Sequence, residues 1–247
     1  MTGRLDILTP LYRELQIERI EETISTLERR IAERFPASSL SRVSAELLRL
    51  AKESEVVIER LRRPIWVLRG GAFLGIAGLI GITVALLLVA VRTSLRVQSI
   101  LDVLQLSESA VNDVILFAAA IFFFVTLETR VKRRTALRAL HHLRSIVHIV
   151  DMHQLSKDPE HLLGPPMPTE SSPRRTFTRF ELARYLDYCS ELLSLSSKLA
   201  ALHVQYVNDE VVLDAVNDIE TLAASLSNKI WQKIMILDIA VPETASR

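Results

Sequence analysis

The stretch of sequence that decides the fold is GGAFLGIAGLIGITVALLLVAV, residues 70–91, which contains no charged side chain. Arg69 and Arg92 bound it on either side. At about 1.5 Å of rise per residue, a helix of this length crosses the roughly 30 Å hydrocarbon core of a bilayer. The stretch therefore predicts a transmembrane helix.

A second apolar run covers residues 114–127 and is shorter, so its length would also suit a buried helix of a soluble protein. Its centre, LFAAAIFFFVTL, has no polar face that water could solvate. Ala110 and Val111 extend it to a span over about 110–127 if Asn112 and Asp113 lie at an interface. We therefore predict a transmembrane hairpin over 64–129 with a short external connection.

An antiparallel hairpin would bring together the charges that flank its two spans. Arg69 would lie near Glu128 at one boundary, and Arg92 would lie near Asp113 at the other. The alternative is that all four side chains reach the water around the lipid headgroups without pairing.

The distribution of Lys and Arg predicts the orientation of this hairpin. Five of these residues lie in 50–69 and six in 128–147, but only two lie in the connection over 92–113. Cytoplasmic flanks carry the excess of positive charge, so both termini should face the cytoplasm. The 24 Arg against 6 Lys are typical of a GC-rich bacterial genome, which makes a bacterial inner membrane the expected location.

Outside the spans, apolar residues recur at steps of three and four, which predicts helices throughout. The predicted segments are an N-terminal cytoplasmic helical hairpin over 1–63, a helical stalk over 130–158 that continues the second span, a Pro-rich linker over 159–176 and a C-terminal helical hairpin over 177–240. The fold class is thus an all-α membrane protein, a transmembrane hairpin with a cytoplasmic helical bundle of long antiparallel helices. The apolar seams of these helices are equally suited to packing within one chain or between chains.

Two short motifs predict where helices begin. Thr9 followed by Pro10 combines a capping side chain with a proline at the first helical position. Thr178 and Glu181 have the spacing of a capping box. Between the two helices of the C-terminal hairpin, a turn is expected at residues 207–210.

Composition excludes several classes of function. The 30 Lys and Arg residues almost balance the 29 Asp and Glu residues, so nucleic acid is not an expected partner. The single cysteine, Cys189, excludes an internal disulfide framework and a cysteine-based zinc site, and it is expected to pack as a small apolar residue. The chain carries no recognisable catalytic motif, so we expect neither an enzyme nor a cofactor.

One stripe of polar residues lies on the predicted stalk. His141, Arg144, His148 and Asp151 fall within about a third of a helix circumference. They could supply two or three ligands to a divalent metal, or they could hold a phosphate. The third interpretation is an ordinary polar stripe in which Arg144 bridges to an acidic residue of another helix.

A basic cluster follows the second span. It consists of Arg130, Lys132, Arg133, Arg134 and Arg138. Just inside a membrane such a run attracts anionic lipids by about 1 kcal/mol per charge. The same charges would also orient the hairpin without binding any lipid specifically.

Small residues line part of the first span. Gly71, Gly75 and Gly78 would let another backbone approach closely, which suggests a self-association face of a homo-oligomer. The alternative is that this face packs against the second span of the same chain, including residues 118–120.

These features lead to three functional hypotheses. In outline the chain is similar to bacterial two-span proteins with helical cytoplasmic extensions, some of which oligomerise into pores. The first hypothesis is a non-enzymatic, self-associating membrane protein that serves cytoplasmic protein partners as a scaffold or signalling module. The second is an oligomeric ion-conducting pore with Asp113 in its pathway, gated by the bundle. The third is a ligand or metal sensor centred on the His-rich stalk.

Overall fold

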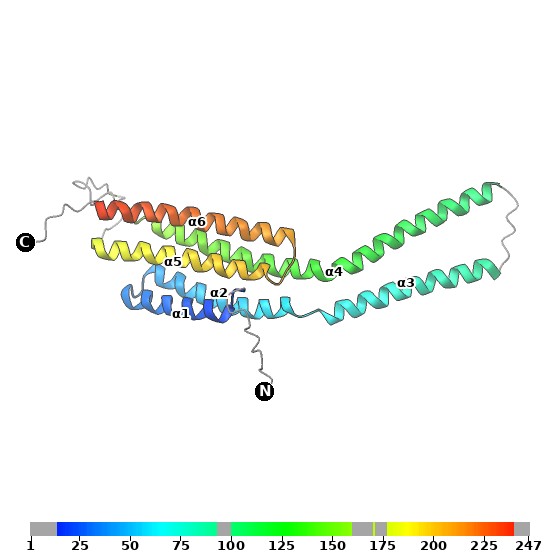
Figure 1. Ribbon diagram of the computed structural model, residues 1–247, viewed down its shortest axis with the longest axis horizontal. Coiled ribbons are helices and arrows are strands. Elements are labelled where there is room, and N and C mark those ends of the chain that lie inside the picture. The colour runs from blue at the N-terminus through cyan, green and yellow to red at the C-terminus, as the bar shows by residue number, and fades with distance from the viewer. Residues whose placement is uncertain (1–13, 93–99, 160–169, 171–176, 240–247) are drawn as a thin grey trace, which may run out of the picture. The chain divides into compact units, whose positions relative to one another are not determined.

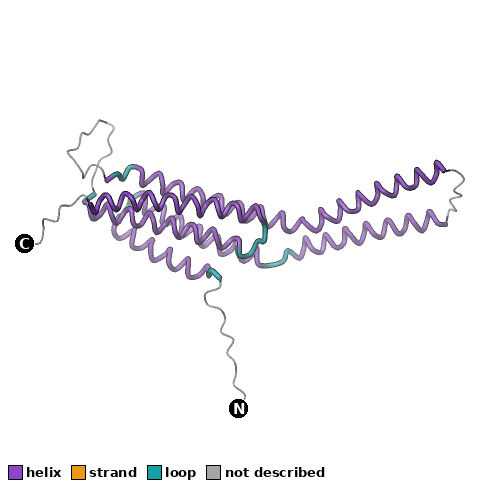
Figure 2. The backbone as a smooth tube through the Cα atoms, turned by 45° about the horizontal axis from the view of Figure 1, so that its top comes forward, coloured by secondary structure: helices purple, strands orange, loops and turns teal. Residues whose placement is uncertain are grey.

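The computed structural model describes residues 14–92, 100–159, 170 and 177–239, and the structural statements below refer to these. The described residues form helices and loops but no strand, as Figures 1 and 2 show, so the predicted all-helical class is confirmed. The helices are α1 (Ile17–Arg34), α2 (Ser39–Arg62), α3 (Trp66–Arg92), α4 (Ile100–Leu155), α5 (Arg179–Val204) and α6 (Glu210–Ile239).

The chain divides into two compact units. The first, which we call the bundle, comprises Met1–Arg62 and Thr135–Arg247, and the second, the apolar hairpin, comprises Arg63–Arg134. Helix α4 is continuous over 56 residues and contributes to both units. The predicted second span and the predicted stalk therefore belong to one helix.

The bundle contains α1, α2, α5, α6 and the C-terminal part of α4 (Figure 1). All five helices contribute to one apolar core, with Ile24, Leu47, Val147, Leu186 and Ile230 each completely buried. In α1 the buried positions follow the predicted spacing of three and four: Ile17, Ile20, Ile24, Leu27 and Ile31. The seams therefore close against one another within a single chain.

The first described helix begins later than the sequence predicts. Thr9 and Pro10 lie outside the described residues, but residues 14–16 are not helical and α1 begins at Ile17. The side chain of Gln205 explains this start. Its Oε1 accepts from the Leu15 backbone N–H at 2.8 Å, and its Nε2 donates to the Leu15 carbonyl at 3.2 Å. Both backbone groups of Leu15 are thus bonded to the end of α5 and not to a helical turn.

The starts of α5 and α6 agree with the sequence. Thr178 caps α5, because its Oγ1 accepts from the Glu181 N–H while the Glu181 carboxylate accepts from the Thr178 N–H, which completes the predicted capping box. The predicted turn at 207–210 separates α5 from α6. Asp209 caps α6 by accepting from the N–H groups of Val211 and Val212. Of the predicted linker over 159–176, only residues 159 and 170 are described.

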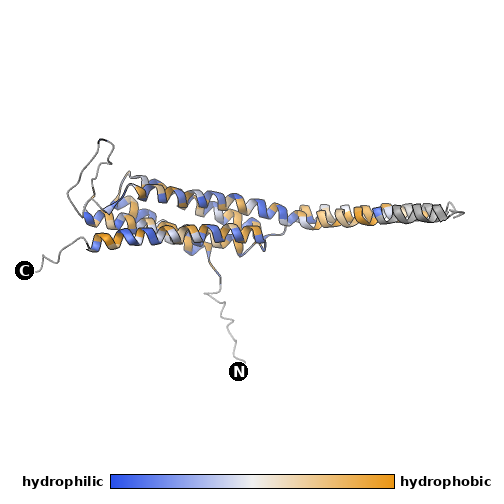
Figure 3. Cartoon of the chain, turned by 90° about the horizontal axis from the view of Figure 1, so that it is seen from above, coloured by the Kyte–Doolittle hydropathy of each residue, from blue (hydrophilic) through white to orange (hydrophobic). Residues whose placement is uncertain are grey.

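The apolar hairpin contains α3 and the N-terminal part of α4. Two helical stretches, one in each of these helices, are long and apolar enough to cross a membrane, and 0% of their most apolar windows is buried. In Figure 3, where the two helices overlap, the described part of the hairpin is mostly hydrophobic, whereas the bundle helices carry both hydrophobic and hydrophilic residues. Helix α4 begins at Ile100, ahead of the predicted span over 110–127, because residues 100–109 contain neither Gly nor Pro to end a helix.

Candidate functional sites

A group of charges joins the two helices of the apolar hairpin. Arg69 on α3 donates from Nε to Oε2 of Glu128 on α4 at 2.7 Å, which confirms the predicted pair. Glu128 Oε1 also lies 3.2 Å from Lys132 Nζ and accepts from the Ile65 N–H at 3.3 Å. These contacts hold the beginning of α3 beside α4. The side chains of the other predicted pair, Arg92 and Asp113, lie outside the described part, and with Asp113 so does the pore candidate.

The basic cluster is not uniform in its surroundings. Lys132 is bound to Glu128, and the guanidinium of Arg130 lies 5.7 Å from the ring centre of Phe123, a cation–π distance. Arg133 also has a partner, whereas Arg134 is exposed. Arg138 belongs to the bundle, where it lines a groove described below. Some of the positive side chains of the basic cluster therefore interact with other residues of the protein.

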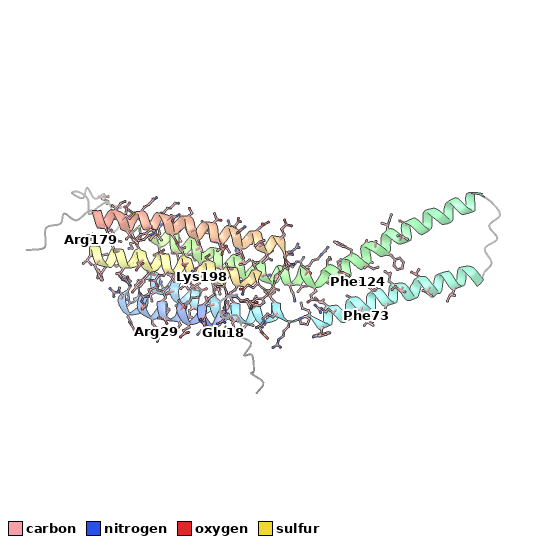
Figure 4. All side chains as sticks on the ribbon, in the orientation of Figure 1. Glu18, Arg29, Phe73, Phe124, Arg179 and Lys198 are labelled. Carbon is pink, nitrogen blue, oxygen red and sulfur yellow. The ribbon has the colours of Figure 1, made fainter. Side chains whose placement is uncertain are left out.

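The glycines of α3 have different neighbours. A Cβ at Gly75 would lie 2.8 Å from the Phe124 ring of α4, so this glycine makes room for an aromatic side chain of the same chain. Figure 4 labels Phe124 on α4. Around Gly71 and Gly78, in contrast, a Cβ would meet nothing within 4 Å. Close packing against α4 within the hairpin therefore explains a glycine at position 75. It does not explain Gly71 and Gly78, which have open space beside them.

The polar stripe of the stalk makes contacts with other side chains of the bundle. Arg144 lies 3.5 Å from the Asp218 carboxylate on α6, the bridge to another helix that the third interpretation predicts. Asp151 accepts from Gln154 Nε2 at 2.7 Å, while His141 and His148 are exposed. Among the residues that the structure describes, no three His, Cys, Asp or Glu side chains are grouped closely enough to hold a metal ion.

Cys189 and His203 are titratable side chains enclosed within the bundle core. Burial raises the pKa of the Cys189 thiol to about 12, which agrees with its predicted role as a packed apolar residue. His203 is also completely buried, and its Nδ1 lies 3.0 Å from the Leu199 carbonyl. Burial lowers the pKa of His203, and its Nε2 has no hydrogen-bond partner among the described residues. The neutral imidazole is therefore the form that fits this core.

The structure also reveals a groove that sequence reasoning missed. It lies between α2 and α4 and has Arg60, Arg138 and His142 among its lining residues. Arg138 was predicted as a member of the basic cluster, and no sequence pattern pointed to Arg60 or His142. Arg60 and Arg138 are far apart in the sequence, so only the packing of α2 against α4 brings them to one groove.

The chain was compared with protein-family models, with curated proteins and with solved structures, and none of the three comparisons found a match.

Proposed function

We propose that this chain is a non-enzymatic integral membrane protein that self-associates and serves as a scaffold or signalling module. In this proposal α3 and the neighbouring part of α4 span a bacterial inner membrane, and the bundle and both termini lie in the cytoplasm. The observation that carries the proposal is the exposure of apolar side chains on the hairpin, where Leu74 is 72% and Val114 67% exposed. A continuous apolar surface of this kind is stable in lipid and unstable in water.

The closed core of the bundle supports a role in protein interaction. Because its seams are filled within one chain, the bundle does not need a second copy to bury its apolar residues. It can then present long polar helix faces to a cytoplasmic protein partner. In this proposal the chain self-associates through α3, where the open space at Gly71 and Gly78 allows a helix of another copy to approach. Anionic lipids are the second proposed partner, attracted by the basic cluster.

Cysteine labelling in sealed inner-membrane vesicles and intact cells tests the topology. Cys189 is buried and is replaced by Ser to give a background without thiols. In intact cells, Ser94→Cys between the two spans should react with a membrane-impermeant maleimide, whereas Ser225→Cys on α6 should react only after permeabilisation. Labelling of Ser225→Cys in intact cells, or release of the protein by alkaline carbonate, would refute the proposed membrane arrangement.

Light scattering of the detergent-purified chain tests self-association. Gly78→Leu adds bulk to the glycine face, and at about 100° per residue the exposed Ala77 lies on another side of α3 and provides the matched control. We expect an oligomer for the natural chain and for Ala77→Leu, and a smaller assembly for Gly78→Leu. A monomer in all three samples would overturn the self-association and leave the membrane arrangement to be judged by the labelling experiment.

A further inference from the structure

The groove between α2 and α4 has a volume of about 270 Å³ and lies wholly within the bundle. Helix α2 contributes one wall and helix α4 the other. The lining residues are Leu50, Glu53, Ser54, Val57, Arg60, Thr135, Arg138, Ala139, His142 and Leu143. Its walls thus combine an apolar floor with polar and charged groups.

The charged groups of the groove leave an excess of positive charge. Arg60 and Arg138 are both exposed, and neither forms an ion pair with any residue that the structure describes. The only acidic side chain in the lining, Glu53, is bound to Arg49 outside the groove. The imidazole of His142 adds a further nitrogen on the α4 wall. Two guanidinium groups from two helices therefore have no carboxylate partner in the described part of the chain.

The size and floor of the groove restrict what it can hold. Pockets for drug-sized molecules begin at about 300 Å³, so this groove suits a small group and not a whole nucleotide. Leu50, Val57 and Leu143 supply apolar contacts beneath the charged rim. A guanidinium presents paired N–H donors that match phosphate oxygens, and Arg is the preferred side chain for such recognition.

We propose that the groove between α2 and α4 binds an anionic phosphate group, held between Arg60 and Arg138 with His142 as a further donor. The phosphate belongs either to the headgroup of an acidic phospholipid or to a small soluble phosphate ester. This site is distinct from the general attraction of the basic cluster for a charged surface, because it needs one arginine from each wall. It also goes beyond the proposed self-association, which involves α3.

The first experiment compares arginines inside and outside the groove. Native mass spectrometry of the full chain in detergent measures binding of phosphatidylglycerol, with phosphatidylcholine as the zwitterionic reference. Arg60→Gln and Arg138→Gln should each weaken phosphatidylglycerol binding about tenfold, the loss expected for one charge-assisted hydrogen-bonding group. Arg42→Gln is the matched control, because Arg42 is an exposed arginine on α2 that lies outside both the groove and the basic cluster. It should change binding less than twofold.

A second arm distinguishes the two sources of the phosphate. Glycerol 3-phosphate is titrated into the same samples by calorimetry. Binding that is lost in Arg60→Gln and Arg138→Gln but kept in Arg42→Gln supports the groove as a site for a soluble phosphate. The same pattern with phosphatidylglycerol alone supports the groove as a headgroup site.

Two results would overturn the proposal. One is an equal loss of binding in all three variants, which a nonspecific surface charge would produce. The other is the absence of any preference for phosphatidylglycerol over phosphatidylcholine together with no binding of glycerol 3-phosphate. The thermal unfolding of each variant is measured in parallel, and because all three arginines are exposed, we expect their melting temperatures to be unchanged.

Discussion

The bundle and the apolar hairpin use the same apolar residues in opposite ways. Leu186 of the bundle is completely buried, whereas Leu74 of the hairpin is 72% exposed. In water a leucine is stabilised by contact with other apolar side chains, and in a bilayer the lipid supplies those contacts. This difference is the one that the proposed membrane arrangement requires, with water around the bundle and lipid around the hairpin.

The largest expected effect follows from removing the same side chain from each unit. Leu186→Ala should lower the free energy of unfolding of the bundle by about 2–5 kcal/mol, because it leaves a cavity in a packed core. Leu74→Ala should change it by less than about 0.5 kcal/mol, because Leu74 lies outside the bundle. Denaturant unfolding of the full chain in detergent, followed by circular dichroism, provides the measurement. Equal destabilisation by both variants would contradict the contrast.

A charge introduced at equal exposure tests the solvent directly. Val56 on α2 and Ile80 on α3 are both 52% exposed. Ile80→Lys should make membrane insertion less favourable by about 2.5–3.5 kcal/mol, because it places a charge inside a proposed span. Val56→Lys should be tolerated within about 0.5 kcal/mol, because that position faces water in the proposed arrangement. The measurement is the fraction of protein that resists carbonate extraction, and equal fractions for the two variants would refute the two-solvent interpretation.

Acid should weaken the bundle through His203. Burial lowers the pKa of this histidine in the folded chain. Below the ordinary histidine pKa of about 6.5, the histidine is therefore protonated in the unfolded state while it stays neutral in the folded state. The free energy of unfolding of the bundle therefore has its full value above that pH. It decreases as the pH falls, by at most about 1.4 kcal/mol per pH unit. Unfolding measured between pH 7.5 and about 5 should show this slope in the natural chain.

Two variants isolate the contribution of His203. His203→Leu should flatten the slope, since it removes the buried group that titrates. His148→Leu, at an exposed position on α4, should leave the slope as it is in the natural chain. A slope that persists in His203→Leu would assign the pH dependence to other groups.

The smallest effect is expected at the boundary pair of the hairpin. Arg69 and Glu128 form a close ion pair, but Arg69 is more than half exposed, so we expect a coupling of no more than about 1 kcal/mol. The charge-swapped double variant, Arg69→Glu with Glu128→Arg, should be more stable than the two single variants predict by addition. Thermal unfolding in detergent of all four chains measures this coupling. Simple additivity would mean that the two charges act independently.

The local features of the fold were predictable from the sequence. Neighbouring residues determine helical periodicity, so the buried series of α1 and the capping box of Thr178 and Glu181 could both be derived from spacing alone. The pairing of Arg69 with Glu128 followed from an antiparallel hairpin of two spans. Each of these predictions needs only local pattern or a single turn of the chain.

The features that depend on distant residues were not predictable. The late start of α1 depends on Gln205, and the groove depends on α2 and α4 each contributing one wall. Open space at Gly78 and its absence at Gly75 depend on where the Phe124 side chain lies. No spacing rule in a single sequence encodes contacts between helices that are so far apart along the chain.

The sequence by itself determined that the chain is helical and that two stretches are suited to lipid. The reason is that the spacing of apolar residues predicts a helix and that an uninterrupted apolar composition is suited to lipid. Only the tertiary structure decided that the five bundle helices close their seams within one chain. The physical reason is that an apolar stripe indicates which face of a helix must be buried, but it does not indicate which other helix packs against that face. The same limit applies to sites, since the groove between α2 and α4 exists only when both walls are in place.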